Sequence, residues 1–116
     1  MTLDRVVKVC QVSNTSINKI CEIKTYLSTV EKFQFLKEYY DVVEQHLKDY
    51  IGYEEFIKLI FFNLMIVKKY TNIELELTYE EFDKLQQYGV IGSIAAQIGA
   101  DYELMMSLIK MKDIKE

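Results

Sequence analysis

His46 is the residue of this sequence best suited to exchange a proton near neutral pH, and it is the single histidine. Because Glu44 and Asp49 lie close to it in the chain, a histidine–acid pair could in principle act as a general base. A metal site would need other ligands, and neither Cys10 nor Cys21 is within helical reach. Since no nucleophile or substrate pocket is evident beside the pair, we expect His46 to be a solvent-facing helix residue. We predict no catalytic residue and no metal site.

Two pairs of adjacent carboxylates, Glu54–Glu55 and Glu80–Glu81, could serve acid–base chemistry if each pair converged on one bond. Neighbouring residues of a helix point about 100° apart, so these pairs do not converge. Both pairs fall in the first turn of a predicted helix, where negative charge interacts favourably with the helix dipole. Gly89–Gly92 suggests a phosphate loop but lacks the Lys-Ser/Thr that should follow. Helix stability is therefore the expected role of these carboxylates.

The remaining nucleophiles lack the sequence context of an active site. Cys10 and Cys21 are outside any CxxC spacing, and free cysteines commonly act as small buried hydrophobic residues. We expect reduced thiols in a cytosolic protein, with a disulfide as the alternative. The serines have no nucleophile-elbow context. The chain is therefore predicted not to be an enzyme and to need no cofactor.

Composition bounds the class of protein. The 116 residues, half of them apolar and 28% charged, are ordinary for one globular domain. The net charge is −4, with 14 basic against 18 acidic residues, and this balance argues against nucleic-acid binding, which needs clustered Lys and Arg. The most apolar stretch is about half the length of a membrane span. We expect neither nucleic acid nor membrane as a partner.

That apolar stretch is Ile57–Val67, in which nine of eleven side chains are apolar. At helical spacing they point in every direction, and a helix that is apolar all round must be buried all round. In so short a chain, the segment is either the central helix of a compact bundle or partly covered by another chain. This alternative makes protein–protein contact the leading functional question.

Helix boundaries are marked by capping boxes and glycines. Ser28–Glu31 and Thr78–Glu81 both have the capping-box pattern, in which side chains bond the unpaired N–H groups of a helix start. Gly89 and Gly99 are expected helix stops. The sequence therefore predicts a mainly α fold, a small bundle of about five helices, beginning near residues 28, 53, 78, 91 and 101.

The apolar positions of these helices predict their inner faces. In the first helix the inner face is expected to carry Phe33, Leu36, Tyr40, Val43 and Leu47. In the last helix, Tyr102, Met105, Leu108 and Ile109 are expected to be buried.

The second predicted helix is expected to run from about Tyr53 through Tyr70 and to end near Asn72, a residue that tolerates the left-handed conformation of a helix stop. The alternating segment Ile73–Leu77 is then either an extended linker or one edge strand.

The N-terminal region is predicted to differ from the bundle. Val6–Val12 is rich in β-branched residues and is followed by the polar cluster Ser13–Ser16, which suggests a strand and a turn. Ile17–Lys24 fits either the returning strand or a short helix, and a short β-hairpin is the preferred interpretation. We predict a single domain over residues 1–116, with 1–27 as hairpin or arm and 28–116 as the bundle.

Aromatic content suggests interaction surfaces. Tyrosine is enriched at protein interfaces, although a tyrosine at the margin of a small core is equally physical. Phe35, Tyr39 and Val42 widen the apolar face of the first helix beyond one neighbour, and Met106 could line a partner groove. The residues predicted to contact a partner are Phe35, Tyr39, Tyr53, Tyr70 and Met106.

Three stretches, Tyr26–Phe33, Lys69–Glu74 and Tyr88–Gly92 with Ile94, Ile98 and Asp101-Tyr102 after them, resemble short acidic proteins of tailed bacteriophages that infect low-GC Gram-positive hosts. Such proteins are similar to products encoded among virion structural and assembly genes. The resemblance implies a non-enzymatic virion or assembly component, of the connector, tail or head adaptor type. It would be assembled in the host cytoplasm and would contact itself or other phage structural proteins.

A second hypothesis is a phage-encoded inhibitor, such as an anti-CRISPR or transcription regulator, whose acidic helix faces occupy a nucleic-acid channel of a host nuclease or polymerase. It requires a contiguous acidic patch, for which the sequence offers Glu74, Glu76, Glu80, Glu81 and Asp83.

Overall fold

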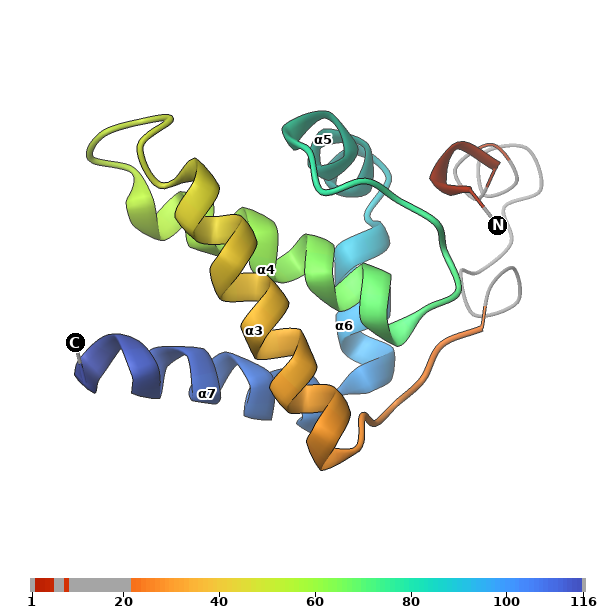
Figure 1. Cartoon of the computed structure of the whole chain (residues 1–116). Helices are drawn as coiled ribbons and strands as arrows, with labels where there is room; N and C mark the ends of the chain where they lie inside the picture. Colours follow the sequence, from red (N-terminus) through yellow and green to blue (C-terminus); the bar gives the residue numbers. More distant parts are fainter. Residues whose placement is uncertain (1, 6–7, 9–21, 116) are drawn as a thin grey trace.

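The computed structural model describes residues 2–5, 8 and 22–115, and five helices account for most of them (Figure 1). They are α3 (Thr29–His46), α4 (Glu54–Tyr70), α5 (Tyr79–Gln87), α6 (Val90–Ile98) and α7 (Ala100–Lys115). The predicted mainly α bundle is therefore confirmed. Most of the predicted N-terminal hairpin lies outside the described residues.

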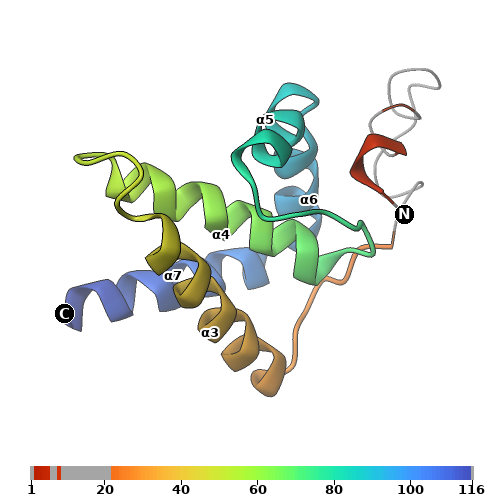
Figure 2. The same cartoon turned by 45° about the horizontal axis from the view of Figure 1, so that its top comes forward.

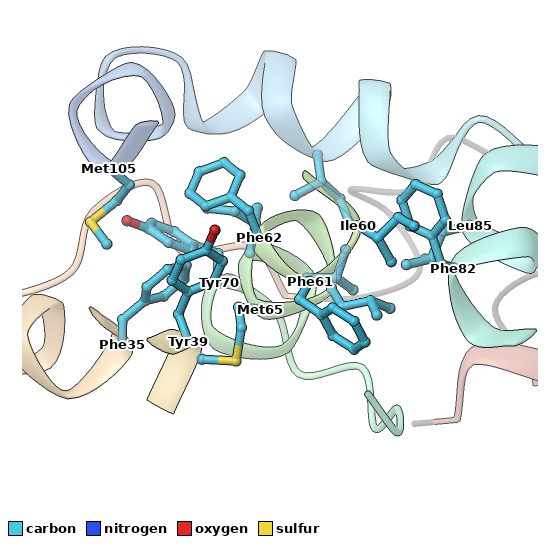
Figure 3. Packing of buried hydrophobic residues seen from close by; sticks show 14 of the residues in the cluster. Phe35, Tyr39, Ile60, Phe61, Phe62, Met65, Tyr70, Phe82, Leu85 and Met105 are labelled. Carbon is cyan, nitrogen blue, oxygen red and sulfur yellow. The ribbon is translucent and has the colours of Figure 1, made fainter. Parts of the chain in front are cut away.

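Helix α4 crosses the middle of the molecule, and the other four helices lie around it (Figures 1 and 2). Every residue from Ile60 to Val67 is buried, which only a central helix achieves in a chain of this size. Its rings and aliphatic side chains form the centre of the hydrophobic core cluster, part of which Figure 3 shows in close-up. Of the two alternatives that the sequence left open, the structure shows the compact bundle, with this segment enclosed by its own chain.

The one polar side chain inside this segment is satisfied by its neighbours. Asn63 donates from Nδ2 to the Leu59 carbonyl at 2.9 Å, and its Oδ1 accepts from the Tyr102 hydroxyl at 2.9 Å. Buried amides are tolerated when their donors and acceptors are paired in this way. The Tyr102 bond also ties α7 to the middle of α4.

Helix α3 begins at the predicted capping box. The Glu31 amide donates to Ser28 Oγ at 3.2 Å, and the Ser28 amide donates to Glu31 Oε1 at 3.0 Å. The hydrogen bond from the Ser28 backbone, followed by the bond to its side chain, holds the pKa of Glu31 below its ordinary value. The predicted start of this helix is therefore confirmed, with both hydrogen bonds of the capping box present.

The inner face of α3 differs from the predicted one. Phe35, Tyr39 and Val43, one turn apart, are the buried residues, whereas Phe33 is 68% exposed. The Phe35 and Tyr39 rings pack edge-to-face on Phe62 of α4, at 6.0 and 6.2 Å between centroids. Of the predicted face, Val43 is buried, and Leu36, Tyr40 and Leu47 are partly buried against the core. Only Phe33 was wrong, because the broad apolar surface of α3 offers two overlapping stripes and the contact with α4 buries Phe35 and Tyr39 instead.

The end of helix α4 agrees with the prediction of a helix through Tyr70. Tyr70 is its last residue, and Thr71 is extended with φ −133°. The Thr71 hydroxyl donates to the Val67 carbonyl at 2.5 Å, and the Asn72 amide donates to the Glu22 carbonyl at 3.3 Å. The segment before α3 also pairs with the last carbonyl of the helix, since the Lys24 amide donates to the Tyr70 carbonyl at 2.6 Å.

The segment 73–77 forms no strand. Within the described part of the chain, its one bridge joins Glu74 to Thr2, and a second isolated bridge joins Ile23 to Thr71. Single bridges do not make a sheet, so the linker alternative is the correct one.

The C-terminal helices follow the predicted punctuation. Thr78 Oγ1 accepts from the Glu81 amide at 3.2 Å, whereas the Thr78 amide donates to the Glu76 carbonyl, so half of the second capping box is present. Gly89 and Gly99 have φ of 66° and 63° and separate α5, α6 and α7. In α7, Met105 and Ile109 are buried as predicted, while Tyr102 and Leu108 are partly buried.

Candidate interaction site

An open, mostly apolar groove of about 450 Å³ lies between the start of α4 and α5. We call it the aromatic groove, and its lining residues come from the α3–α4 loop, the first half of α4 and α5. The loop contributes Tyr50 and Tyr53, and the lining residues of α5 recur three, four and seven positions after its first residue, so they share one face. The lining residues are Tyr50, Tyr53, Phe56, Ile57, Ile60, Tyr79, Phe82, Asp83 and Gln86.

The rim of the aromatic groove is unusually exposed for side chains of its kind. Tyr50, Tyr53 and Phe56 are 60%, 65% and 52% exposed, and the adjacent Ile51 is 86% exposed. Single exposed apolar residues are common, but four within seven positions, beside a groove, form the kind of patch that marks an interaction site. This segment is the strongest candidate contact surface in the described part of the chain.

One wall of the groove is held by a hydrogen-bonded cluster. Asp49 Oδ2 accepts from the Tyr79 hydroxyl at 2.7 Å and lies 2.9 Å from His46 Nδ1. The His46 ring stacks on Phe61, with 4.5 Å between centroids and 20° between planes. The prediction that His46 faces solvent is correct only in part, because its side chain is 30% exposed while the ring covers the edge of the core and its nitrogen is paired with Asp49.

The electrostatics of this cluster favour a charged Asp49 and a neutral Tyr79. The hydrogen bonds from Tyr79 and then from His46 hold the pKa of Asp49 below its ordinary value. Partial burial, with the bond to Asp49, raises the pKa of Tyr79 to about 12. Near neutral pH the phenol is therefore a hydrogen-bond donor that fixes the groove wall, and it is not a base or a nucleophile.

The paired carboxylates occupy the first turns of their helices, as predicted. The Gly52 amide donates to Glu54 Oε1 at 3.2 Å, and Glu55 pairs with Lys58 at 3.4 Å. Among the residues that the structure describes, no three His, Cys, Asp or Glu side chains are grouped so that they could hold a metal ion.

The structure divides the five predicted contact residues. Phe35, Tyr39 and Tyr70 are at most 1% exposed and form part of the core, so in this fold they cannot contact a partner directly (Figure 3). Sequence spacing placed Phe35 and Tyr39 on a surplus apolar face of α3, but that face is the one that packs against α4. Of the other two, Tyr53 lies on the rim of the aromatic groove.

Met106 lies at a second, smaller pocket of about 220 Å³ between α4 and α7, where it is partly buried. The buried Tyr39 ring forms part of the floor of that pocket beside Leu59 and Phe62. The structure thus brings Tyr39 and Met106 together but places Tyr53 in a different groove.

Sequence reasoning missed Tyr50, Phe56 and Tyr79 as groove residues. The available signal was the group of apolar residues on both sides of Gly52. Aromatic side chains in a turn between helices are often not buried, because no helix face directs them into the core. Which helix completes the groove could not be read from spacing, since α5 returns to this site after a linker.

The acidic row of the second hypothesis is mixed with positive charge. Glu76, Glu80 and Asp83 are exposed, whereas Glu81 is partly buried. Lys84 lies 3.8 Å from Glu81 and 2.8 Å from Asp4, so a cation interrupts the row.

No protein-family model, curated protein or solved structure matches this chain. In the part that the structure describes, none of the helices has the length and apolar character that crossing a membrane demands.

Proposed function

We propose that this protein is a small non-enzymatic adaptor that binds another protein through the aromatic groove. The single observation that carries the proposal is the run of exposed apolar side chains from Tyr50 to Phe56 beside that groove. Burying such a patch releases about 25 cal/mol per Å² of apolar area, and aromatic anchors concentrate this energy in a few residues. Assignment to bacteriophage assembly rests on the sequence resemblance alone.

The alternative use of these rings is to complete the core, and the packing of α4 argues against it. Ile57 and Ile60, on the floor of the groove, are already buried at 1% and 5% exposure. The rim rings therefore add little to the burial of the core, and their substitution should leave folding intact. This separation between floor and rim is what allows a binding test without unfolding.

The proposal is tested by site-specific cross-linking in infected cells. The photoreactive residue p-benzoylphenylalanine replaces Tyr53 on the rim, and in a control protein it replaces Gln97, which is exposed on α6 and does not line the groove. We expect Tyr53 to give one discrete adduct whose second component is a phage structural protein, identified by mass spectrometry. No adduct at Tyr53, or equal adducts at both positions, would contradict the proposal.

A matched pair of surface variants supplies the second arm. Tyr53→Ala removes a rim ring without adding a helix-capping hydroxyl, and Phe33→Ala removes a ring of similar exposure from α3 that does not line the groove. Both should change the free energy of unfolding by less than about 0.5 kcal/mol, as exposed positions usually do. Only Tyr53→Ala should reduce incorporation into phage particles.

A further inference from the structure

Five of the nine lining residues of the aromatic groove are aromatic, and they present rings from three elements. The face of an aromatic ring carries partial negative charge, so several rings around one space attract a cation. Tyr50 and Tyr79 meet edge to face at 6.1 Å and 76°, and the Tyr50 side chain is 60% exposed. The rings alone therefore favour a cation that also has an apolar body.

The charged groups in and near the groove also favour a cationic ligand. Asp83 lines it, and Glu54 and Glu80 lie in the first turns of α4 and α5, the two helices that form it. None of the lining residues is Lys, Arg or His. An anionic ligand would meet repulsion from Asp83, and a purely aliphatic one would leave this carboxylate unused.

The lysines that neighbour the groove residues in sequence form ion pairs with other acids. Lys84, the neighbour of Asp83 in sequence, pairs with Asp4 at 2.8 Å and with Glu81 at 3.8 Å. Lys58 pairs with Glu55 at 3.4 Å. Asp83 forms no ion pair with any residue that the structure describes. A cation brought by a ligand would therefore find an available carboxylate beside the rings.

We propose that the aromatic groove binds an arginine side chain presented by the partner protein, with its guanidinium on the rings and toward Asp83 and its methylene stem along Tyr53 and Phe56. This inference rests on the proposed function and names the chemistry of its partner. Arginine fits better than lysine because its flat guanidinium stacks on rings and can also bond a carboxylate side-on. The volume of about 450 Å³ is within the range of pockets that enclose a side chain together with its apolar neighbours.

The test uses peptides of one design that differ at a single position. Each is acetyl-Leu-Xaa-Leu followed by a Gly-Ser spacer and one tryptophan, with arginine, lysine, norleucine or glutamate as Xaa. Because the protein contains no tryptophan, the fluorescence anisotropy of the peptide reports binding without background from the protein. Amide shifts of Asp83 and Gln86 in ¹H–¹⁵N spectra then report whether the peptide occupies the groove.

We expect the arginine peptide to bind about threefold to tenfold more tightly than the norleucine peptide, with glutamate the weakest. Asp83→Asn should weaken the arginine peptide about twofold to fivefold and leave the norleucine peptide unchanged. Asp41→Asn, which removes an exposed carboxylate of α3, should change neither. Raised salt should reduce the preference for arginine, because the pair is partly open to solvent.

Three results would overturn the inference. Equal binding of the norleucine and arginine peptides would show an apolar anchor site, and absence of shifts at Asp83 and Gln86 would show no peptide site. Binding of free arginine amide as tight as that of the arginine peptide would show a site for small organic cations. In the first two cases the proposed function is judged separately by the Tyr53 cross-link, which does not depend on the chemistry of the partner side chain.

Discussion

The Tyr70 hydroxyl donates a hydrogen bond of 2.5 Å to Asp101, joining the last residue of α4 to the first turn of α7. Asp101 is 9% exposed, and a buried carboxylate is tolerated only when it is paired. Lys32 lies 3.0 Å from its Oδ1, and the Leu27 amide donates to its Oδ2 at 3.2 Å. One carboxylate thus ties α3, α4, α7 and the segment before α3 together.

Removing the hydroxyl of Tyr70 should destabilise the protein measurably. Tyr70→Phe retains the buried ring and deletes one hydrogen bond to a charged acceptor, which is typically worth about 1.5–3 kcal/mol. Urea unfolding monitored by circular dichroism should show this loss in the free energy of unfolding. Tyr53→Phe, at an exposed position, is the control and should cost less than about 0.5 kcal/mol. Equal costs for the two variants would show that the Asp101 bond contributes nothing.

Neutralising Asp101 should cost more than removing the Tyr70 hydroxyl, because it leaves the largely buried Lys32 ammonium without its carboxylate, with only the Leu27 carbonyl and the Tyr26 ring beside it. Lys32 is 13% exposed as a side chain, and breaking a buried ion pair from one side costs about 3–5 kcal/mol. We therefore expect Asp101→Asn to lower the unfolding midpoint strongly, with partial recovery in the double variant Lys32→Met/Asp101→Leu. If the double variant is the less stable of the two, the unpaired Lys32 is not the cause.

The stabilisation from Asp101 should depend on acid pH. Burial opposes its charged form, but the hydrogen bonds from Tyr70 and Lys32 outweigh burial and lower its pKa below the ordinary value. A carboxyl whose pKa is lower in the folded state stabilises the fold above the unfolded value, about 3.9, and this contribution is lost as the pH falls through the folded value. The difference between the wild type and Asp101→Asn should therefore be full at pH 6 or above and shrink below about pH 4.

Sequence patterns predicted this fold where the cause is local. The Ser28 capping box and the Gly89 and Gly99 stops act within four residues, so their physics is present in the chain itself. The burial of Phe35 in place of Phe33 could not be predicted, because both residues are apolar and the choice is made by contact with Phe62. The buried role of Asp101 was missed for the same reason, since its partners Lys32 and Tyr70 are distant in sequence.

In the candidate site, too, residue type was visible in the sequence and tertiary packing was not. Tyr53 was identified as a contact residue from its type alone, and its exposure depends on the turn at Gly52. Tyr39 and Tyr70 have the same composition signal but lie in the core. Residue type therefore suggested an interface, and only tertiary packing separated rim rings from core rings.

Two glycines give a matched test of the turn between α5 and α6. Gly89 has φ 66°, a conformation in which a Cβ is strained, whereas Gly92 lies within α6 and a Cβ there would meet nothing within 4 Å. Gly89→Ala should therefore destabilise the protein by about 1 kcal/mol or more. Gly92→Ala should stabilise it by about 0.5–1 kcal/mol, since alanine is the better helix former. Thermal unfolding should show shifts of opposite sign, and shifts of the same sign would contradict this account of the turn.

The bond between Tyr79 and Asp49 predicts an alkaline dependence of stability. The folded pKa of Tyr79, about 12, lies above the ordinary value of about 10. Its contribution is therefore fully present below about pH 10 and is lost as the pH rises through the folded value. Tyr79→Phe removes this titration, so the wild type should be more stable than the variant near neutral pH, and the difference should shrink by about pH 11.

The Tyr79 resonance in ¹³C spectra gives the pKa of this hydroxyl directly. Asp49→Asn should lower it only part of the way to the ordinary value, because burial, the largest cause of the shift, remains when the carboxylate is neutralised. An unchanged pKa in Asp49→Asn would show that the hydrogen bond does not act on Tyr79. A constant difference in stability between the wild type and Tyr79→Phe from neutral to alkaline pH would show that the groove wall does not depend on the protonated phenol.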